Sequence, residues 1–216
     1  MLRRKFQLMA IAAAFLFGLS FVSAQELIPI QLPQPQTEIG KPLMQALKLR
    51  ASSRSFDTKP LPLQEISNLL WAAYGINRPE DRKRTAPSAM DWQEYDVFVV
   101  LAEAVYTYDA KSNSLAPVIS GDQRALCGVQ DFVKTAPLNL VYVADYSKAT
   151  RGSEDDKKLF VTVDCGFIAQ NVYLYCASQG LAVVVRGMVD REKLTQTLNL
   201  KPEQKIILSQ TVGYPK

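Results

Sequence analysis

The sequence predicts an α+β domain, and three observations lead to this class. Its 216 residues are 48% hydrophobic and 21% charged, which is typical of one globular domain and excludes disordered and fibrous chains. Several segments repeat apolar residues at helical spacing and have recognisable helix ends. Short apolar segments that are typical of strands lie between them, and the chain has no internal repeat.

The first 24 residues have the three parts of a secretory signal peptide. Basic residues occupy 3–5, an apolar run covers 8–17, and small residues lie at 22–24. The apolar core is short for a membrane span of about 20 residues, so cleavage is favoured over a membrane anchor. We expect export, to the periplasm or outside the cell, after cleavage near Ala24. Cleavage would lower the net charge from +4 to +1, too little for a nucleic-acid partner, and would leave no stable membrane span.

The segment that follows the expected signal peptide is rich in proline. Residues 25–40 contain three prolines and lack helical or strand periodicity, which predicts an extended leader that either wraps around the domain or hangs free. The globular domain itself is expected over 41–216. Its first helix is predicted over 41–50, and a second helix is predicted from Pro62 to Gly75.

The middle of the chain alternates predicted strands with loops. Residues 76–94 are predicted to form a long loop, and loops of this length are often functional. An amphipathic helix is predicted over 122–133 and a short helix over 191–198. A turn is predicted around 112–114, and strands are predicted over 97–101, 105–108, 138–144, 183–185 and 206–212.

The longest predicted helix lies between Ser153 and Gly180. Ser153 can cap its N-terminus, the first turn carries three acidic residues that suit the helix dipole, and glycine is a common helix terminator. Apolar side chains point in nearly every direction around this helix. A helix that is apolar all round is expected to be buried all round, so we expect a central helix that a second subunit partly covers.

The three cysteines do not suggest a metal site, because no CxxC or other metal-binding spacing occurs. Cys165 and Cys176 are eleven positions apart on the long predicted helix. That separation is a rise of about 16 Å, which exceeds the roughly 7 Å limit between bridged α-carbons. A disulfide between Cys127 and either of them remains open. Three buried free thiols are the favoured interpretation.

Histidine is absent from the sequence, which limits the chemistry that side chains can perform. Neither a Ser-His-Asp triad nor a Cys-His pair can form, and the usual general base near neutral pH is missing. We therefore expect a bound organic cofactor to supply the reactive atoms.

A cluster of basic and hydroxyl residues follows the first predicted helix. Arg50, Ser52 and Arg54 lie in one short turn, where two guanidinium groups can converge on a phosphate. Arginines are also expected near a helix C-terminus because of the helix dipole. A solvated cluster is therefore the alternative interpretation of this motif taken alone.

Eight short motifs follow one another along the chain. They are R-x-S-x-R-x-F from Arg50, LLWAAYGINR from Leu69, RTAPSA from Arg84, VYTYD from Val105, GDQR from Gly121, AQN from Ala169, QGLAVVVRGMVD from Gln179 and VGYP from Val212. Their common order, over residues 40–215, resembles the nitroreductase-like FMN-dependent family. Within it, the chain is most similar to the branch with the dehydrogenases that oxidise thiazolines and oxazolines in modified peptides.

This resemblance implies an FMN-dependent oxidoreductase that passes hydride or electron pairs through its flavin by alternate reduction and reoxidation. The implied fold has a central, mostly antiparallel sheet flanked by helices. Two chains are implied to intertwine as a homodimer with FMN between them, and the implied substrate is a small molecule or a peptide. The alternative is a non-catalytic exported binding or scaffold protein that retains the fold.

The same resemblance implies roles for residues at both ends of the chain. Arg50 and Ser52 would contact the phosphate and the ribityl chain. Arg54 would lie near the pyrimidine edge of the ring, where positive charge stabilises the reduced flavin anion. Backbone at Arg186 and Gly187 would approach N5, the atom that takes the hydride, because glycine has no Cβ.

The Pro-Ser-Ala turn is implied to line the flavin ring from the other subunit. This turn consists of Pro87, Ser88 and Ala89. Four residues after the proline, the family usually has an asparagine where this chain has Asp91, and an ionised carboxylate cannot donate a hydrogen bond. Glu94 stands where the family has a further proline. Trp92 would cover a substrate pocket or, as the alternative, belong to the core or an interface.

Overall fold

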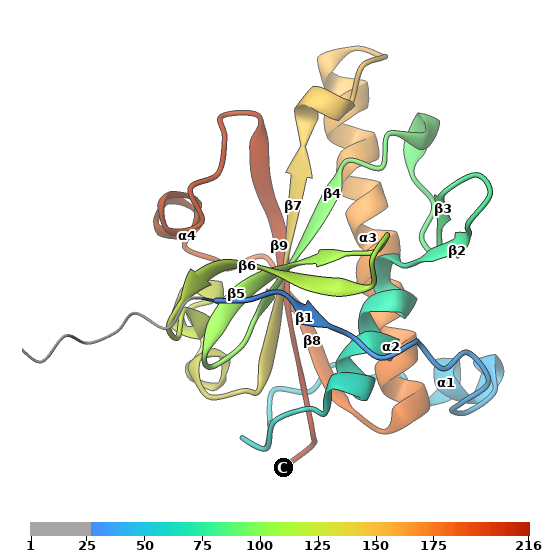
Figure 1. Ribbon diagram of the computed structural model, residues 1–216, viewed down its shortest axis with the longest axis vertical. Coiled ribbons are helices and arrows are strands. Elements are labelled where there is room, and N and C mark those ends of the chain that lie inside the picture. Colours follow the sequence, from blue (N-terminus) through green and yellow to red (C-terminus); the bar gives the residue numbers. More distant parts are fainter. Residues whose placement is uncertain (1–26) are drawn as a thin grey trace, which may run out of the picture.

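The computed structural model describes residues 27–216, so the expected signal peptide over 1–24 lies outside the described residues. In this part of the chain a seven-stranded sheet forms the centre of the domain, with the strand order β1-β6-β5-β4-β7-β9-β8 (Figure 1). Every pairing in it is antiparallel, which confirms the predicted class and sheet. The strands are β1 (Ile30–Gln31), β4 (Tyr95–Val100), β5 (Ala104–Asp109), β6 (Ser114–Ser120), β7 (Leu138–Asp145), β8 (Ala182–Arg186) and β9 (Gln204–Gly213).

Helices cover both faces of this sheet. α2 (Leu63–Tyr74) and α3 (Glu154–Gln179) pack on one face, with α1 (Leu43–Leu49) against α3 (Figure 1). α4 (Arg191–Thr197) lies on the opposite face. The short 3-10 helices and the remaining strands are β2 (Ile76–Arg78), β3 (Lys83–Arg84), η1 (Ala89–Asp91), η2 (Arg124–Cys127), η3 (Asp131–Lys134) and η4 (Tyr146–Lys148).

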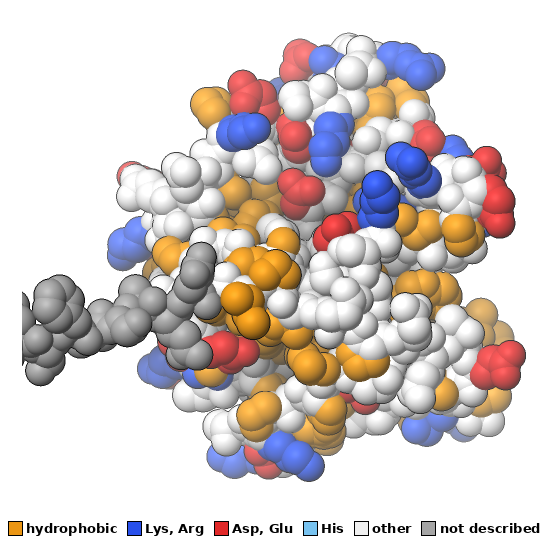
Figure 2. Space-filling view, viewed as in Figure 1, with side chains coloured by type: hydrophobic (Ala, Val, Ile, Leu, Met, Phe, Trp, Pro, Cys, Tyr) orange, Lys and Arg blue, Asp and Glu red, His pale blue; other side chains and the backbone are white. Residues whose placement is uncertain are grey.

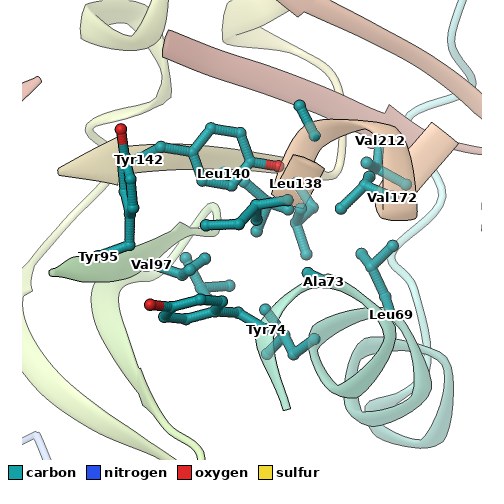
Figure 3. Packing of buried hydrophobic residues seen from close by; sticks show 14 of the residues in the cluster. Leu69, Ala73, Tyr74, Tyr95, Val97, Leu138, Leu140, Tyr142, Val172 and Val212 are labelled. Carbon is teal, nitrogen blue, oxygen red and sulfur yellow. The ribbon is translucent and has the colours of Figure 1, made fainter. Parts of the chain in front are cut away.

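The alternation of side chains along β4 and β7 divides the core into two clusters. Val97 and Val99 of β4 pack with Leu140 of β7 toward α2 and α3 (Figure 3). Phe98 and Val100 point the other way, toward α4 and η2. Successive strand residues face opposite sides, and both sides are covered here. This explains why these strands are continuous hydrophobic runs in the sequence.

The ends of α3 confirm the predicted long helix. The Ser153 hydroxyl accepts a hydrogen bond from the Asp156 amide at 3.1 Å, and the Asp156 carboxylate accepts one from the Ser153 amide, completing a capping box. Gly180 ends the helix with a φ of 76°, in the left-handed region that glycine tolerates. By length and composition α3 could cross a membrane, but eight of its residues are buried inside the domain.

Within one chain α3 is not buried on all sides, and the expected cover by a second subunit stays a prediction. Leu159, Val163 and Phe167 are 58%, 42% and 43% exposed. Residues four apart lie above one another on a helix, so these three form one apolar line, called the α3 stripe below. Met44 and Leu47 of the adjoining α1 are exposed as well.

Three other segments differ from the sequence-based prediction. The helix expected over 122–133 is instead two 3-10 helices, η2 and η3, separated by Gly128. A Cβ on Gly128 would lie 1.8 Å from Nη1 of the buried Arg186, so this packing overrides the helical periodicity. The loop expected over 76–94 contains the β2–β3 hairpin and η1. The sequence does not predict β6.

The leader wraps around the domain over its described part. Ile30 and Gln31 pair with Leu115 and Ser114 at the edge of β6, and Leu32 is buried. The Ser67 hydroxyl of α2 donates a hydrogen bond to the Pro33 carbonyl. This N-terminal segment therefore belongs to the folded domain.

All three cysteines are free and buried, which confirms the favoured interpretation. Burial raises the pKa of Cys127 and Cys165 to about 12, so these thiols stay protonated near neutral pH.

Candidate functional site

The turn that follows α1 is held against α3 and β8. The Ser53 amide donates a hydrogen bond to the Val183 carbonyl of β8 at 2.9 Å. The Ser52 hydroxyl lies 2.8 Å from the Tyr173 hydroxyl of α3. The guanidinium carbon of Arg50 lies 5.4 Å from the centre of the Tyr173 ring. Tyr173 thus brings Arg50 and Ser52 together, and it was not among the candidate residues from the sequence.

Tyr173 also connects this turn to the end of β8. Its hydroxyl accepts a hydrogen bond from the Val185 amide at 3.0 Å. Because β8 is the edge strand of the sheet, this bond gives a partner to an amide that points away from β9. Gly187 follows β8 and is exposed, and a Cβ there would meet only Cδ2 of Leu208, at 3.9 Å. The backbone at Gly187 is therefore open to a ligand.

The first and last motifs of the domain lie side by side. Phe56 forms an isolated bridge with Pro215, and the Asp57 amide donates a hydrogen bond to the Tyr214 carbonyl at 2.9 Å. Arg54, which is exposed, precedes this contact by two residues. The turn that carries Arg50, Ser52 and Arg54 is called the basic turn below. It therefore lies with the VGYP segment at one end of the sheet.

The Arg186 side chain faces away from this place and is buried. It donates hydrogen bonds to the Cys127 carbonyl at 2.7 Å, to Oδ1 of Asn139 at 3.0 Å and to Oγ1 of Thr211 at 2.7 Å. Burial lowers the pKa of Arg186 to about 10, which still leaves it charged at neutral pH. The expected contribution of Arg186 to cofactor binding is therefore limited to its backbone, while its side chain ties β8 to β7 and β9.

The Pro-Ser-Ala turn is anchored from inside the domain. The Ser88 hydroxyl donates a hydrogen bond to Oε2 of Glu94 at 3.1 Å, and the Ala89 amide donates one to Oδ2 of Asp164 at 2.7 Å. Pro87 is the exposed member of the turn. A ring placed against the turn would therefore meet Pro87 and the backbone rather than the Ser88 hydroxyl.

The segment around this turn has strained backbone. Arg82, Met90, Asp91 and Gln93 have φ values of 55°, 51°, 58° and 46°, in the left-handed region that disfavours residues with a Cβ. The Gln93 amide group donates hydrogen bonds to the Arg82 carbonyl at 3.2 Å and to Oδ1 of Asp91 at 3.1 Å. Side-chain contacts thus hold a backbone that would otherwise relax.

Asp91 lies at the surface of this segment and forms an ion pair. Its Oδ2 lies 2.7 Å from Nζ of Lys83, and hydrogen bonds from Lys83 and Gln93 hold the pKa of Asp91 below its usual range. The negative charge that the sequence places near the flavin therefore has a partner cation in the same chain.

Trp92 belongs to the core, which favours the second of its two interpretations. It is 8% exposed and packs edge-on against Phe160, with the ring centres 6.3 Å apart. Its role beside a substrate pocket stays a prediction.

Two buried carboxyl groups beneath the turn were not among the candidate residues from the sequence. Glu94 is fully buried, and Asp164 is 4% exposed. Burial, together with the nearby charge of Asp164, raises the pKa of Glu94 to about 7, and burial also raises the pKa of Asp164. Oε1 of Glu94 has no hydrogen-bond partner among the described residues. The one feature of the sequence that could have pointed to them is Glu94, which stands where the family that this chain resembles has a proline.

The two halves of the candidate site contact different turns of α3. The Pro-Ser-Ala turn contacts α3 at Asp164, and the basic turn contacts it at Tyr173. These positions are nine residues apart, a rise of about 13 Å along a helix. The structure therefore joins Arg50 and Ser52 to the end of β8, but it places Ala89 elsewhere along α3.

Grooves occur beside both halves. One of about 270 Å³ is lined by Ala51, Ser53 and Val183, next to the basic turn. Another of about 560 Å³ lies beside the β2–β3 hairpin, where Arg84 and Tyr108 line it. Charged side chains of both signs are scattered over the face shown in Figure 2.

Known proteins are similar to this chain in sequence and in fold. The model of the Nitroreductase family matches residues 47–214. Proteins of Methanocaldococcus jannaschii and of Ralstonia eutropha JMP134, both named "putative nitroreductase", are similar to this chain. The first is 32% identical over 180 residues, which cover 76% of this chain and 90% of the relative. The crystal structure of the second is 43% identical with a TM-score of 0.81, and the match covers 87% of this chain and 90% of that one.

More distant structures have the same fold. The NADPH:FMN oxidoreductase of Vibrio harveyi, complexed with NAD+, is 20% identical with a TM-score of 0.60, and the match covers 81% of this chain and 69% of that one. The family match spans the basic turn, the Pro-Ser-Ala turn and the end of β8. On these grounds, the chain belongs to the nitroreductase family of oxidoreductases.

Proposed function

We propose that this chain is an exported FMN-dependent oxidoreductase that binds its flavin between two copies. The observation that carries the proposal is the convergence of Arg50 and Ser52 on Tyr173, beside the open backbone at Gly187. Guanidinium groups bind phosphate through charge-assisted hydrogen bonds. Backbone without a Cβ lets a flat ring approach closely.

The residues gathered here fit FMN. Arg50 and Arg54 are exposed and provide two fixed positive charges for a phosphate, and the Ser52 hydroxyl lies between them in the chain. When bound, FMN supplies the transfer of hydride or electron pairs. Arg50 and Ser52 hold its phosphate and ribityl chain, and Arg54 places positive charge toward the pyrimidine edge, where negative charge develops on reduction.

A second copy of the chain supplies the Pro-Ser-Ala turn in this proposal. The exposed α3 stripe and Met44 of α1 support it, since contiguous apolar surface commonly marks an interface. Pro87 would then shield one side of the ring from water.

Substrate class and export complete the proposal. The order of the motifs supports a small-molecule or peptide substrate, as in the branch that oxidises thiazolines and oxazolines. The basic and apolar pattern of residues 1–24 supports cleavage near Ala24. N-terminal sequencing of the protein recovered from outside the cytoplasm tests export: a chain that begins near Gln25 supports it, and an intact Met1 in the cytoplasm contradicts it.

The visible spectrum of the purified chain tests flavin binding. A yellow protein whose absorbance is bleached by a chemical reductant is the expected result. A colourless protein that takes up no added FMN would contradict the proposal and favour the non-catalytic scaffold.

Arg50→Ala tests the position of the phosphate. The variant should lose about 1.5–3 kcal/mol of FMN binding, the value of a hydrogen bond to a charged group, while its fold is retained. Flavin fluorescence titration measures the affinity, and circular dichroism checks the fold. Arg151→Ala, which removes the same charge from the exposed loop before α3, is the control. An equal loss of FMN affinity in both variants would show that Arg50 contributes only through the net charge and does not contact the phosphate.

A further inference from the structure

A buried carboxyl pair lies directly behind the Pro-Ser-Ala turn. Glu94 precedes β4, and Asp164 is in α3. Each holds one polar group of the turn, since Glu94 accepts the Ser88 hydroxyl at 3.1 Å and Asp164 accepts the Ala89 amide at 2.7 Å. The turn is thus fastened to the sheet through one carboxyl group and to α3 through the other.

The two carboxyl groups are fixed, whereas the backbone that follows the turn is strained. The Glu94 carbonyl accepts a hydrogen bond from the Asp145 amide at 2.9 Å, which holds Glu94 where β4 begins to pair with β7. Asp164 lies within the long helix α3. Met90 and Asp91, which follow the turn, have left-handed backbone. The geometry of the turn therefore depends on the carboxyl pair.

The pair has no cation of its own. The nearby Arg84 instead places its guanidinium carbon 4.2 Å from the centre of the Tyr74 ring and donates a hydrogen bond to Oε1 of Gln93. Within residues 27–216, no ion pair joins Glu94 or Asp164 to a Lys or Arg. Two neighbouring buried carboxyl groups without a cation do not both ionise readily.

We propose that Glu94 and Asp164 share one proton and act as positioning residues that hold the Pro-Ser-Ala turn in the geometry needed at the flavin ring. This inference rests on the proposed function, which assigns the turn to the ring. With the proton present, the Asp164 carboxylate binds the Ala89 amide and Glu94 is neutral beside Ser88. Loss of the proton leaves two negative charges in a buried site, and the turn opens so that water can hydrate them.

The other groups that face the pair do not change charge near neutral pH. Burial raises the pKa of three tyrosines and a cysteine above their ordinary values of 10.0 and 9.0. These groups are Tyr74 of α2, Tyr95 of β4, Tyr146 of η4 and Cys165 of α3. The charged Arg84 of β3 lies against the Tyr74 ring. A transition near pH 7 therefore belongs to the pair, in agreement with the raised pKa of Glu94.

Hydrogen exchange of the Ala89 amide in the flavin-free protein tests the pair directly. Between pH 7 and 8, the protection of this amide, corrected for its intrinsic exchange rate, should fall by about fivefold, since a transition near pH 7 lowers the protonated fraction from about one half to about one eleventh. Glu94→Gln keeps an acceptor for Ser88 and removes the charge, so its protection should be equal at pH 6 and 9. Asp96→Asn, which removes a β4 carboxylate that pairs with Lys148, is the matched control and should keep the parent profile.

A second variant keeps the test informative if Glu94→Gln does not fold. Hydrogen exchange of amides in β4 and α3, measured in the same experiment, shows whether each variant is folded. Asp164→Asn keeps an acceptor for Ala89 and removes the neighbouring charge, so the transition should move to lower pH. Protection that does not change with pH in the parent would overturn the proposal. So would a Glu94→Gln variant that retains the pH dependence of the parent.

FMN titration at pH 6 and 8.5 then links the pair to the flavin. The parent should bind FMN about thirtyfold more weakly at pH 8.5, because the protonated fraction of a group with a transition near pH 7 falls from about 0.9 to about 0.03, whereas Glu94→Gln should lack this decrease. A chain that binds no FMN at either pH refutes the proposed function, while the Ala89 exchange still decides on the pair. Equal FMN affinity at both pH values, alongside a change in Ala89 protection, would overturn the role of the pair at the flavin.

Discussion

Replacing Tyr173 by phenylalanine tests how the basic turn is organised. The change removes one hydroxyl and keeps the ring, so Arg50 retains its aromatic neighbour at 5.4 Å. The Val185 amide and the Ser52 hydroxyl lose their common partner. Water replaces that partner at Ser52, which is exposed, but less readily at the partly buried Val185 amide. We expect the free energy of unfolding to fall by about 1 kcal/mol.

The same change should weaken flavin binding through the turn. Once the Ser52 hydroxyl has lost its partner, the backbone of Ser52 has to be ordered again when FMN binds. The entropic cost of ordering one residue is about 1–2 kcal/mol. This corresponds to roughly tenfold weaker binding. Thermal denaturation measures the stability, with an expected decrease in Tm of about 2–4 °C for a domain of this size. Flavin fluorescence titration measures the affinity.

Tyr175→Phe is the matched control on the same helix. Its hydroxyl donates a hydrogen bond to Oε1 of Glu65 on α2, away from the basic turn. This variant should lose comparable stability and bind FMN as the parent does. If Tyr173→Phe also keeps the parent affinity, the turn does not depend on Tyr173 and the reasoning is refuted.

Stability should fall as the pH rises from about 4.5 to about 7 and level off above it, because burial raises the pKa of Glu94 from 4.5 to about 7 and the folded state keeps a proton that the unfolded state releases in this range. Urea denaturation from pH 5 to 8 measures this, and a rising profile would contradict it. Gly128→Ala should cost about 2–3 kcal/mol of stability, because its Cβ would lie 1.8 Å from Nη1 of Arg186. Thermal denaturation checks this, and an unchanged Tm would show that the arginine moves aside freely. Phe167→Glu should convert a dimer to a monomer in sedimentation experiments, because the interface would have to desolvate a charge. A variant that still sediments as a dimer would place the interface away from the α3 stripe.

Elements with strong local signals could be predicted from the sequence. The boundaries of α3 follow from Ser153, three acidic residues and Gly180, all of which act within one helical turn of the helix ends. The apolar runs of β4 and β7 are short and bounded, as strands require. These features depend on neighbours in the sequence, so no tertiary information is needed to find them.

The errors arise where distant residues decide the local structure. Arg186 and Gly128 are 58 residues apart in the sequence, yet the packing of one against the other breaks the helix expected over 122–133. β6 contains Pro117, which argues against a strand, but its pairing with β5 and β1 forms it nonetheless. Periodicity within a short window contains neither of these contacts.

The candidate site shows the same division. The motifs locate Arg50, Ser52 and Gly187, because the resemblance carries their positions along the chain. The contact between Ser52 and Tyr173 joins residues 121 apart, and the contact between Ala89 and Asp164 joins residues 75 apart. Only the folded chain shows that Tyr173 organises one half-site and that a carboxyl pair supports the other.

Residues 30–32 cover part of the edge of the sheet at β6. With Ile30 and Gln31 paired to Leu115 and Ser114, the backbone of β6 is not offered to another molecule at these positions. Proteolysis beyond Leu32 would remove β1 and expose the edge of β6. The unpaired backbone groups of β6 could then pair with a strand of another molecule.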